Sequence, residues 1–183
     1  MITGKRVELR PVSLADFKRT YKWRNDEEVA VMSAGEDFFR YSHVSEEQLE
    51  DAFEKVIKML DRRESCQFSI YTKDEPALHI GSIGYRDLNP VSRCCTLGIS
   101  IGERAYWSKG YGSDAVNSLL RYLFQSMNIE RVQLDTWSGN TRAIRSYEKC
   151  GFTIEGRLRN NAYVNGAYYD TIVMGILRKE YSL

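Results

Sequence analysis

A glycine-rich turn between a predicted strand and a predicted helix constrains this chain more than any other feature. It reads Trp107-Ser108-Lys109-Gly110-Tyr111-Gly112-Ser113-Asp114-Ala115. Alternating apolar residues predict a strand over residues 95–102, and helically spaced apolar residues predict an amphipathic helix over 112–127. Backbone N–H groups at a helix N-terminus have no intrahelical partner, and the helix dipole favours negative charge there. The turn therefore predicts a binding site for a phosphorylated ligand.

Composition excludes several classes of partner. The 183 residues carry a formal net charge of +1, which gives no general attraction to nucleic acid or to a membrane surface. The sequence contains no apolar run long enough to span a bilayer, and residues 1–8 do not resemble a signal peptide. We therefore expect one domain over residues 1–183 in the cytoplasm, with no nucleic-acid or membrane partner.

The cysteines and histidines predict no metal site. Cys94 and Cys95 are adjacent, which suits neither a disulfide framework nor metal-ligand spacing. Cys66 and Cys150 stand apart from them, so we interpret all four cysteines as reduced thiols. The two histidines also lack ligand spacing.

The predicted elements indicate an α/β fold. Ser13 is a plausible helix N-cap, Ser45 to Gln48 form a capping box, and Asn140 caps a short helix that Gly151 ends. Strands are predicted over 7–12, 66–71, 78–88, 95–101, 131–136, 152–158 and 168–177, and helices over 14–24, 46–60, 112–127 and 141–150, with a long loop or broken helix over 25–44. We expect one mixed, mostly antiparallel sheet flanked by helices, with parallel strands on either side of the glycine turn.

The glycines have two other interpretations. Residues 110–115 match the G-x-G-x-x-[GA] dinucleotide fingerprint, and Asp135 follows near the expected distance. An antiparallel meander precedes the turn, however, which disfavours a nicotinamide-binding enzyme. The other alternative is that the glycines merely allow a tight start to the helix.

Two separated segments carry a resemblance to a known family. Residues 106–115 resemble the acetyl-CoA pyrophosphate loop of the GNAT superfamily of N-acetyltransferases, and residues 140–152 look like its second hallmark, an Asn, an Ala and then Tyr-Glu-Lys-x-Gly-Phe. Leu9-Arg10-Pro11 and Trp23-Arg24-Asn25-Asp26 resemble the branch that acetylates ribosomal-protein N-termini, together with its polyamine and aminosugar relatives. The resemblance covers nearly the whole chain.

The resemblance implies a GNAT-like fold and transfer of an acetyl group from acetyl-CoA to an amine by direct attack. The pyrophosphate would bind the amides of residues 108–113, Asn140 would contact the pantetheine arm, and the strand before the loop would diverge from its neighbour with a bulge at Gly98. Trp107 stands where the family usually has Gln or Arg. The predicted acetyl-CoA contacts are Ile99, Ser100, Ile101, Trp107, Ser108, Lys109, Gly110, Tyr111, Gly112, Ser113 and Asn140.

Tyr147 matches the tyrosine that these enzymes aim at the sulfur of CoA. A phenol has a pKa of about 10, so it is protonated at neutral pH and can protonate the departing thiolate; the alternative is a tyrosine packed in the core. Thr96 stands where relatives place a glutamate base and cannot serve. Glu103 is the predicted substitute, with a solvated turn acid, a water chain or an already neutral amine as alternatives.

The acceptor is less constrained than the donor. The substrate end is predicted to be built from Trp23, Arg24, Asn25 and the irregular segment 36–43, in which Phe38 would supply an apolar wall, and Asp170 could bind a cationic substrate. Trp23 equally suits the end of a helix in the core. The amine could be a protein N-terminus, a polyamine, an aminosugar or an antibiotic. The resemblance also makes a homodimer reasonable, and a catalytically idle acyl-CoA sensor on the same fold remains an alternative.

Overall fold

A single eight-stranded sheet runs through the molecule in the order β1-β2-β3-β4-β5-β6-β8-β7. The computed structural model describes residues 1–59, 61 and 63–182. The strands are β1 (Ile2–Thr3), β2 (Val7–Pro11), β3 (Cys66–Thr72), β4 (His79–Asn89), β5 (Cys94–Ile101), β6 (Arg131–Trp137), β7 (Thr153–Val164) and β8 (Ala167–Leu177). The sheet is mixed, because β5 and β6 pair in parallel and the other neighbours pair antiparallel. The predicted fold class is confirmed.

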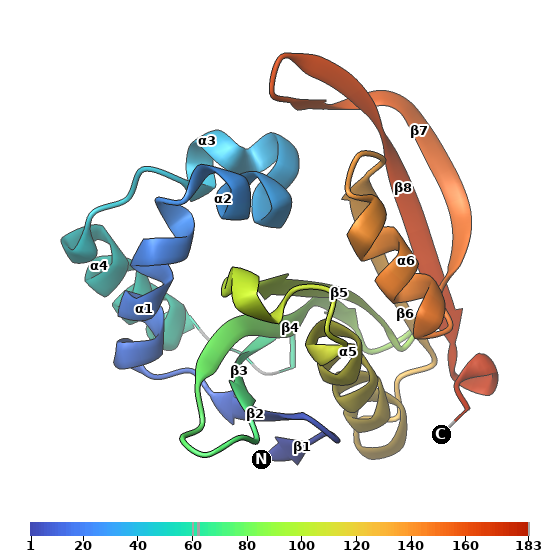
Figure 1. Ribbon diagram of the computed structural model, residues 1–183. Helices are drawn as coiled ribbons and strands as arrows, with labels where there is room; N and C mark the ends of the chain where they lie inside the picture. Colours follow the sequence, from blue (N-terminus) through green and yellow to red (C-terminus); the bar gives the residue numbers. More distant parts are fainter. Residues whose placement is uncertain (60, 62, 183) are drawn as a thin grey trace.

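The helices fall into two groups (Figure 1). Residues 14–59 form α1 (Leu14–Arg24), α2 (Glu27–Ala34), the short α3 (Phe38–Tyr41) and α4 (Glu46–Met59), with a 3-10 turn, η1 (Gly35–Asp37), between α2 and α3. The second group is α5 (Tyr111–Arg121), which continues as a π-helical turn over Tyr122–Ser126, and α6 (Thr141–Lys149). The predicted broken helix over 25–44 is therefore α2, η1 and α3.

Side-chain caps explain where several helices begin. Ser13 Oγ accepts from the Asp16 amide and the Asp16 carboxylate accepts from the Ser13 amide, which is a complete capping box. Ser45 and Gln48 exchange the same two bonds before α4. Asn140 Oδ1 accepts from the Ala143 amide at the start of α6. These three predicted helix starts are confirmed.

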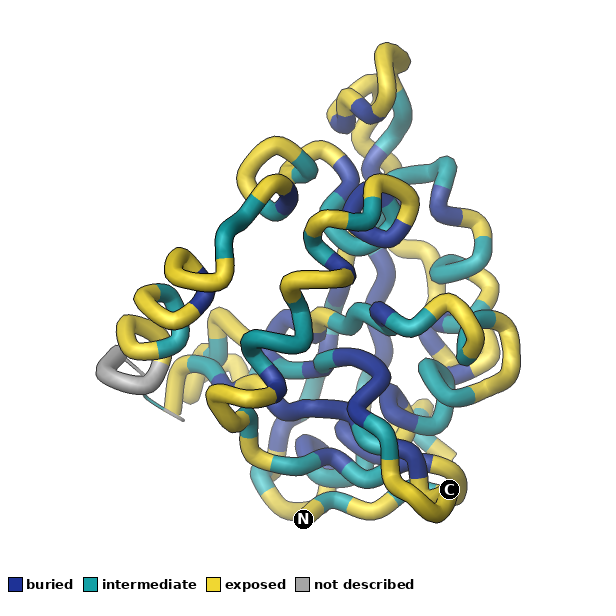
Figure 2. The backbone as a smooth tube through the Cα atoms, turned by 60° about the vertical axis from the view of Figure 1, so that its left-hand side comes forward, coloured by how far each residue is buried: buried dark blue, intermediate teal, exposed yellow. Residues whose placement is uncertain are grey.

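The core lies between the sheet and α5. Leu119, Leu120 and Leu123 are fully buried on one side, and Ile70, Ile83 and Val132 are buried on the strands. In Figure 2 the buried segments gather in the interior and the outer turns of the chain are exposed. Burial of side chains of this size supplies about 1.5–3 kcal/mol each, so this packing holds the glycine turn in place.

One parallel pair differs from the repeated parallel units of a dinucleotide-binding fold. Within the described sheet, β5 and β6 are the only neighbours that run parallel, and an antiparallel meander of β2 to β5 precedes them. This topology gives no support to the nicotinamide alternative.

Candidate active site

Strands β5 and β6 separate soon after they begin. They pair only from Cys94 to Thr96 on β5 and from Arg131 to Gln133 on β6, although both strands continue beyond these residues. The predicted divergence is therefore present. The predicted bulge at Gly98 is wrong, because Gly98 pairs in register with Gly84 and the irregularity of this ladder lies between Arg86 and Asn89. A Cβ at Gly98 would meet no atom within 4 Å, so this glycine leaves space between the strands.

The glycine turn presents the start of α5 to this opening. Gly110 has φ +86°, a conformation that favours glycine, and Ser108 also has positive φ, at +58°. No side chain caps α5 at Gly110, so the first N–H groups of the helix are open to a ligand. An anionic group such as a phosphate can accept hydrogen bonds from these N–H groups.

A cavity of about 630 Å³ lies beside this turn, and we call it the α5–α6 cavity. Its walls include most of the predicted acetyl-CoA contacts, namely Ile99, Ser100, Ile101, Trp107, Ser108, Gly110, Gly112, Ser113 and Asn140. The other two, Lys109 and Tyr111, belong to the turn but stand outside the cavity wall, and the Tyr111 hydroxyl donates to Asp74 at 3.3 Å.

Short contacts brace the wall of the α5–α6 cavity. Ser113 Oγ lies 2.9 Å from Ser146 Oγ and joins the start of α5 to α6. The Cys150 thiol donates to the Ser113 carbonyl at 3.6 Å. The Trp107 indole N–H donates to the Ile101 carbonyl at 2.6 Å and ties the turn to the end of β5. An open helix N-terminus, a glycine with positive φ and a braced cavity are the features that a phosphate-bearing ligand such as acetyl-CoA needs.

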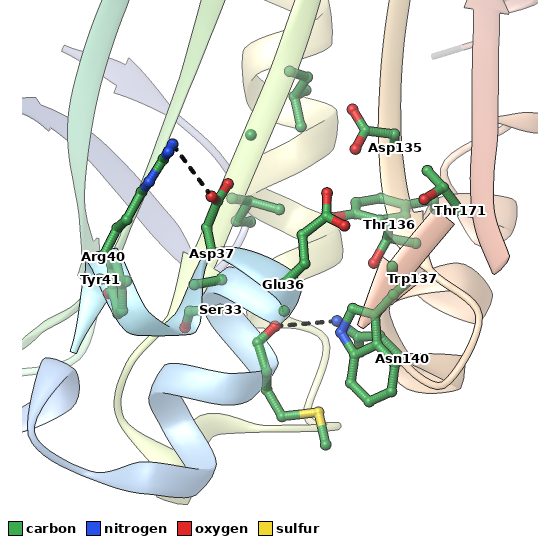
Figure 3. A pocket seen from close by; sticks show the side chains of 18 of the residues that line it. Ser33, Glu36, Asp37, Arg40, Tyr41, Asp135, Thr136, Trp137, Asn140 and Thr171 are labelled. Atoms are coloured by element: carbon green, nitrogen blue, oxygen red, sulfur yellow. Dashed lines mark hydrogen bonds and ion pairs between the residues drawn. The ribbon is translucent and has the colours of Figure 1, made fainter. Parts of the chain in front are cut away.

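A second cavity, of about 530 Å³, lies between α2 and β6, and we call it the α2–β6 cavity (Figure 3). It takes residues from the widened end of the sheet, including Leu97, Gly98 and Ile99 on one side and Asp135, Thr136 and Trp137 on the other. Three carboxylates and three guanidinium groups line it, from Glu36, Asp37, Asp135, Arg24, Arg40 and Arg86.

The charges of the α2–β6 cavity are mostly paired. Asp37 lies 3.8 Å from Arg40, and Asp135 lies 3.9 Å from Arg86. Arg24 donates to the Tyr41 carbonyl at 2.6 Å and stacks over the Tyr41 ring. Glu36 has no ion-pair or hydrogen-bond partner among the described residues, and Figure 3 shows its side chain extended toward Thr136. Glu36 is exposed, and its carboxylate has no ionic partner among the described residues.

The two cavities meet at five residues that line both. These are Met32, Ser33, Ile99, Asn140 and Tyr147. The two cavities are therefore adjacent and share this part of their walls. Ser33 Oγ lies 2.6 Å from Ser100 Oγ, so polar groups of α2 and β5 also meet there.

Tyr147 stands at the junction with its hydroxyl unused. Its side chain is 8% exposed, its ring packs against Phe152, and its hydroxyl forms no hydrogen bond with any described residue. Burial, with smaller contributions from Asp135 and Cys150, raises the pKa of Tyr147 well above its ordinary value. The phenol is therefore protonated over the whole physiological range and is free to donate.

Glu103 and Trp23 lie together away from both cavities. The Trp23 indole N–H donates to Glu103 Oε1 at 3.3 Å, and Arg19 lies 3.5 Å from the same oxygen. Trp23 is 5% exposed and packs against Gly102, where even a Cβ would collide with the indole. The position of Glu103 gives no support to its predicted role as a base, and Trp23 lies in the core rather than in a cavity wall.

Of the other predicted substrate-binding residues, only Arg24 lines the α2–β6 cavity. Phe38 packs edge-on against His43 with ring centroids 5.8 Å apart. The Asp170 carboxylate binds Arg157 at 2.8 Å and the Asn160 amide at 3.0 Å, within the β7–β8 hairpin. Neither Phe38 nor Asp170 lines either cavity.

The substrate end was predicted to include the irregular segment 36–43, so Glu36 lies where the acceptor was expected, although its carboxylate was not singled out. Asp135 was considered only as the acid of the dinucleotide fingerprint, and Arg142 was given no role within the second hallmark segment. Asp135 follows a buried strand residue at the open end of β6, which is a recognisable signal. Nothing local marks Arg142 or Glu36, because the fold alone brings them to the cavities. In the described part of the chain no three His, Cys, Asp or Glu side chains are grouped to hold a metal ion. No described helix combines the length and apolar character that membrane crossing requires.

Comparison with known proteins identifies the family. Residues 6–153 match the family described as "Acetyltransferase (GNAT) domain". The chain is 26% identical to spermidine N(1)-acetyltransferase of Vibrio cholerae over 178 residues, covering 97% of this chain and 96% of that protein. It is 30% identical over 101 residues to the putative ribosomal N-acetyltransferase YdaF of Bacillus subtilis, covering 55% of each.

A solved structure agrees with the fold. The crystal structure of Vibrio cholerae spermidine N-acetyltransferase in complex with CoA and spermine superposes with a TM-score of 0.81 at 24% identity, covering 96% of this chain and 97% of that chain. The family match covers most of the sequence, and the fold matches along nearly its whole length. This chain belongs to the GNAT family and is an N-acetyltransferase that takes its acetyl group from acetyl-CoA.

Proposed function

We propose that this enzyme acetylates a small polycationic amine of the polyamine class, which binds in the α2–β6 cavity. The observation that carries the proposal is the carboxylate of Glu36, which lines that cavity without an ionic partner among the described residues. Glu36 is exposed, and an unpaired carboxylate in a cavity wall favours a cation, since charge-assisted hydrogen bonds are about twice as strong as neutral ones.

The donor is proposed to bind in the α5–α6 cavity, with its pyrophosphate at the open N-terminus of α5. The thioester then lies at the junction of the two cavities, beside Ile99 and Tyr147. An amine held in the α2–β6 cavity approaches the same point from the opposite side. This arrangement supports direct attack, because both reactants reach one place without a covalent enzyme intermediate.

Tyr147 is proposed to protonate the departing thiolate. Its hydroxyl is free of partners in the described structure and its raised pKa keeps the proton in place. The proposal assigns no dedicated base, because Glu103 is held by Trp23 and Arg19 outside both cavities. An amine that arrives neutral needs no base before it attacks. Its nitrogen loses one proton after the attack, and that proton balances the one that Tyr147 gives to the thiolate, so the phenol is restored.

The relatives support this acceptor class. Spermidine N(1)-acetyltransferases of Vibrio cholerae and of Escherichia coli K12 are 26% and 28% identical to this chain over almost its full length. The relative named for ribosomal acetylation matches over a shorter part of the chain. A peptide N-terminus is therefore the main competing acceptor.

Thiol release from acetyl-CoA tests the proposal. The acceptors are spermidine, spermine, glucosamine and a peptide with an N-terminal alanine, each compared at equal concentration. Spermidine and spermine should give the highest kcat/KM. Turnover of the peptide but not of spermidine would overturn the proposed acceptor, and binding of CoA without turnover of any amine would favour the idle sensor.

A matched pair of variants tests the role of Glu36. Glu36→Gln should raise the KM for spermidine about tenfold, since a charged hydrogen bond contributes about 1.5–3 kcal/mol and part of it is screened by solvent. Asp37→Asn is the control, because that carboxylate lines the same cavity but already faces Arg40 at 3.8 Å. Equal effects of the two substitutions would count against a specific role for Glu36.

A further inference from the structure

Arg142 on α6 stacks on the indole of Trp107, the residue that begins the glycine turn. The guanidinium carbon lies 3.6 Å from the centroid of the ring. The indole itself is fixed, because its N–H donates to the Ile101 carbonyl at 2.6 Å. A guanidinium that stacks on a fixed aromatic ring keeps its N–H donors free, because these donors lie in the plane of the guanidinium and point away from the ring.

Arg142 has no competing partner for those donors. It forms no ion pair or hydrogen bond with any described residue, although it is half-buried. Burial lowers the pKa of Arg142, an effect that Glu28 opposes in part. A desolvated cation without a counter-charge is costly for the free protein, and a bound anion removes that cost.

The surroundings of Arg142 match a polyanion. Arg142 lines the α5–α6 cavity together with Ser108 and Gly110 of the turn. Arg145 and Lys149 follow it on α6 at spacings of three and seven residues, which places the three cations on one face of the helix. In the described structure none of the three forms an ion pair. This cationic face and the open N-terminus of α5 both line the α5–α6 cavity.

We propose that Arg142 binds a phosphate group of CoA and that Trp107 is a positioning residue that holds its guanidinium for that contact. Trp107 carries no charge, so its contribution to phosphate binding is made through Arg142. The inference rests on the proposed location of the donor in the α5–α6 cavity. It is independent of the acceptor.

Calorimetric titration of the acceptor-free enzyme with CoA and with 3′-dephospho-CoA tests this proposal. Arg142→Gln should weaken CoA binding about 10- to 100-fold, as expected for loss of a charge-assisted contact. An equal loss for both ligands places the contact at the pyrophosphate, and a loss confined to CoA places it at the 3′-phosphate. Lys179→Gln removes one positive charge outside both cavities and should change neither affinity.

Trp107 variants test the positioning role. Trp107→Phe keeps an aromatic platform and loses the indole N–H, whereas Trp107→Leu loses both. Trp107→Leu should weaken CoA binding about 3- to 10-fold more than Trp107→Phe in the parent enzyme, and should add no further loss to Arg142→Gln. Thermal unfolding of each variant confirms that it folds.

Three results would contradict the inference in whole or in part. If Arg142→Gln binds CoA as tightly as the parent, Arg142 makes no phosphate contact, while the donor site itself stands. If the parent enzyme binds no CoA, the proposed donor site fails as well, and the inference fails with it. Fully additive effects of Trp107→Leu and Arg142→Gln would exclude the positioning role of Trp107.

Discussion

The side-chain amide of Asn140 donates a hydrogen bond to the main-chain carbonyl of Met32 at 3.2 Å. The other end of the same side chain, Oδ1, accepts from the Ala143 amide at 3.3 Å and caps α6. Asn140 therefore starts one helix and connects it to the last turn of another, at the junction of the two cavities. One residue thus caps a helix and lines both cavities.

Asn140→Asp separates these two roles. Aspartate retains an oxygen that can accept from Ala143, but it cannot donate to Met32, and its charge faces a carbonyl oxygen. We expect the melting temperature to change little and kcat/KM for the amine to fall about tenfold or more. Asn140→Ala removes both bonds and should also lower the free energy of unfolding, by about 1 kcal/mol for the cap. An unaltered kcat/KM in Asn140→Asp would confine the residue to capping.

Tyr147→Phe tests the proposed acid. The phenylalanine ring fills the same buried space, so the fold and the affinity for acetyl-CoA should be retained, while kcat falls about 100-fold or more. Because the pKa of Tyr147 is raised by burial, the proton is retained in alkaline solution, and kcat of the parent enzyme should show no loss near pH 10 from this group. Steady-state kinetics from pH 7 to 10 measure both effects. Unchanged kcat in Tyr147→Phe would remove the residue from the mechanism.

The two glycines of the turn make different predictions. Gly110 has φ +86°, so Gly110→Ala should destabilise the protein by about 1–2 kcal/mol through backbone strain, although its Cβ would meet open space. Gly112 has an ordinary helical conformation, and its Cβ would lie 3.6 Å from Ile101, which is normal contact. Gly112→Ala should keep or raise the melting temperature, because alanine favours helix.

Affinity for CoA then decides why Gly112 is a glycine. The residue lines the α5–α6 cavity, so an added methyl group obstructs the approach of a phosphate to the backbone. We expect Gly112→Ala to weaken CoA binding at least tenfold in a titration. Undiminished binding would mean that the glycines serve only to start the helix.

A buried polar cluster behind the first helix predicts a pH effect on stability. His79 is 3% exposed, its Nε2 lies 2.9 Å from the Gly81 carbonyl, and its Nδ1 lies 3.6 Å from Asp16. The rings of Tyr71 and Trp23 pack against it. Burial lowers the pKa of His79 below its ordinary value, although the Asp16 carboxylate and the Gly81 carbonyl oppose this.

The sign of the effect follows from that lowered pKa. Below about pH 6.5 the unfolded chain binds a proton at this histidine and the folded chain does not, so stability falls as pH decreases from there. The slope from this one group is at most about 1.4 kcal/mol per pH unit. Urea unfolding of the parent and of His79→Gln between pH 5.0 and 7.5 measures it, and the variant should lose less stability over that range. Identical slopes would show that His79 titrates alike in both states.

Local sequence was sufficient for most of the fold. The capping residues Ser13, Ser45 and Asn140 each start a helix where predicted, and the alternating segments became strands. The largest error is in β7, which was predicted to end at 158 and continues to Val164. The pairing of β7 with β8 is irregular between Leu158 and Ala162, and there the Asp170 carboxylate accepts from the Asn160 amide and joins the two strands. Asn165 and Gly166, both with positive φ, were the available signal for the hairpin turn.

Local sequence also predicted part of the candidate site. The glycine turn and Tyr147 were recognisable because each lies in a contiguous motif. The individual roles of Glu36 and Arg142 were not recognisable, since each side chain gains its surroundings from distant elements. The structure gives no support to the predicted site roles of Trp23 and Glu103, because the Trp23 indole N–H donates to the Glu103 carboxylate and both residues lie outside the two cavities. A cytoplasmic location and a homodimer stay predictions.

The origin of the two cavity walls has a consequence for how enzymes of this architecture diversify. Apart from Met32 and Ser33, every residue of the α5–α6 wall follows position 98, whereas Glu36, Asp37 and Arg40 come from the short helical pieces after α2. Substitutions in η1 and α3 can alter the charge of the proposed amine site without changing the residues of the proposed CoA site. Specificity for the amine can therefore change while the site for acetyl-CoA is retained, so that one donor serves enzymes with many different acceptors.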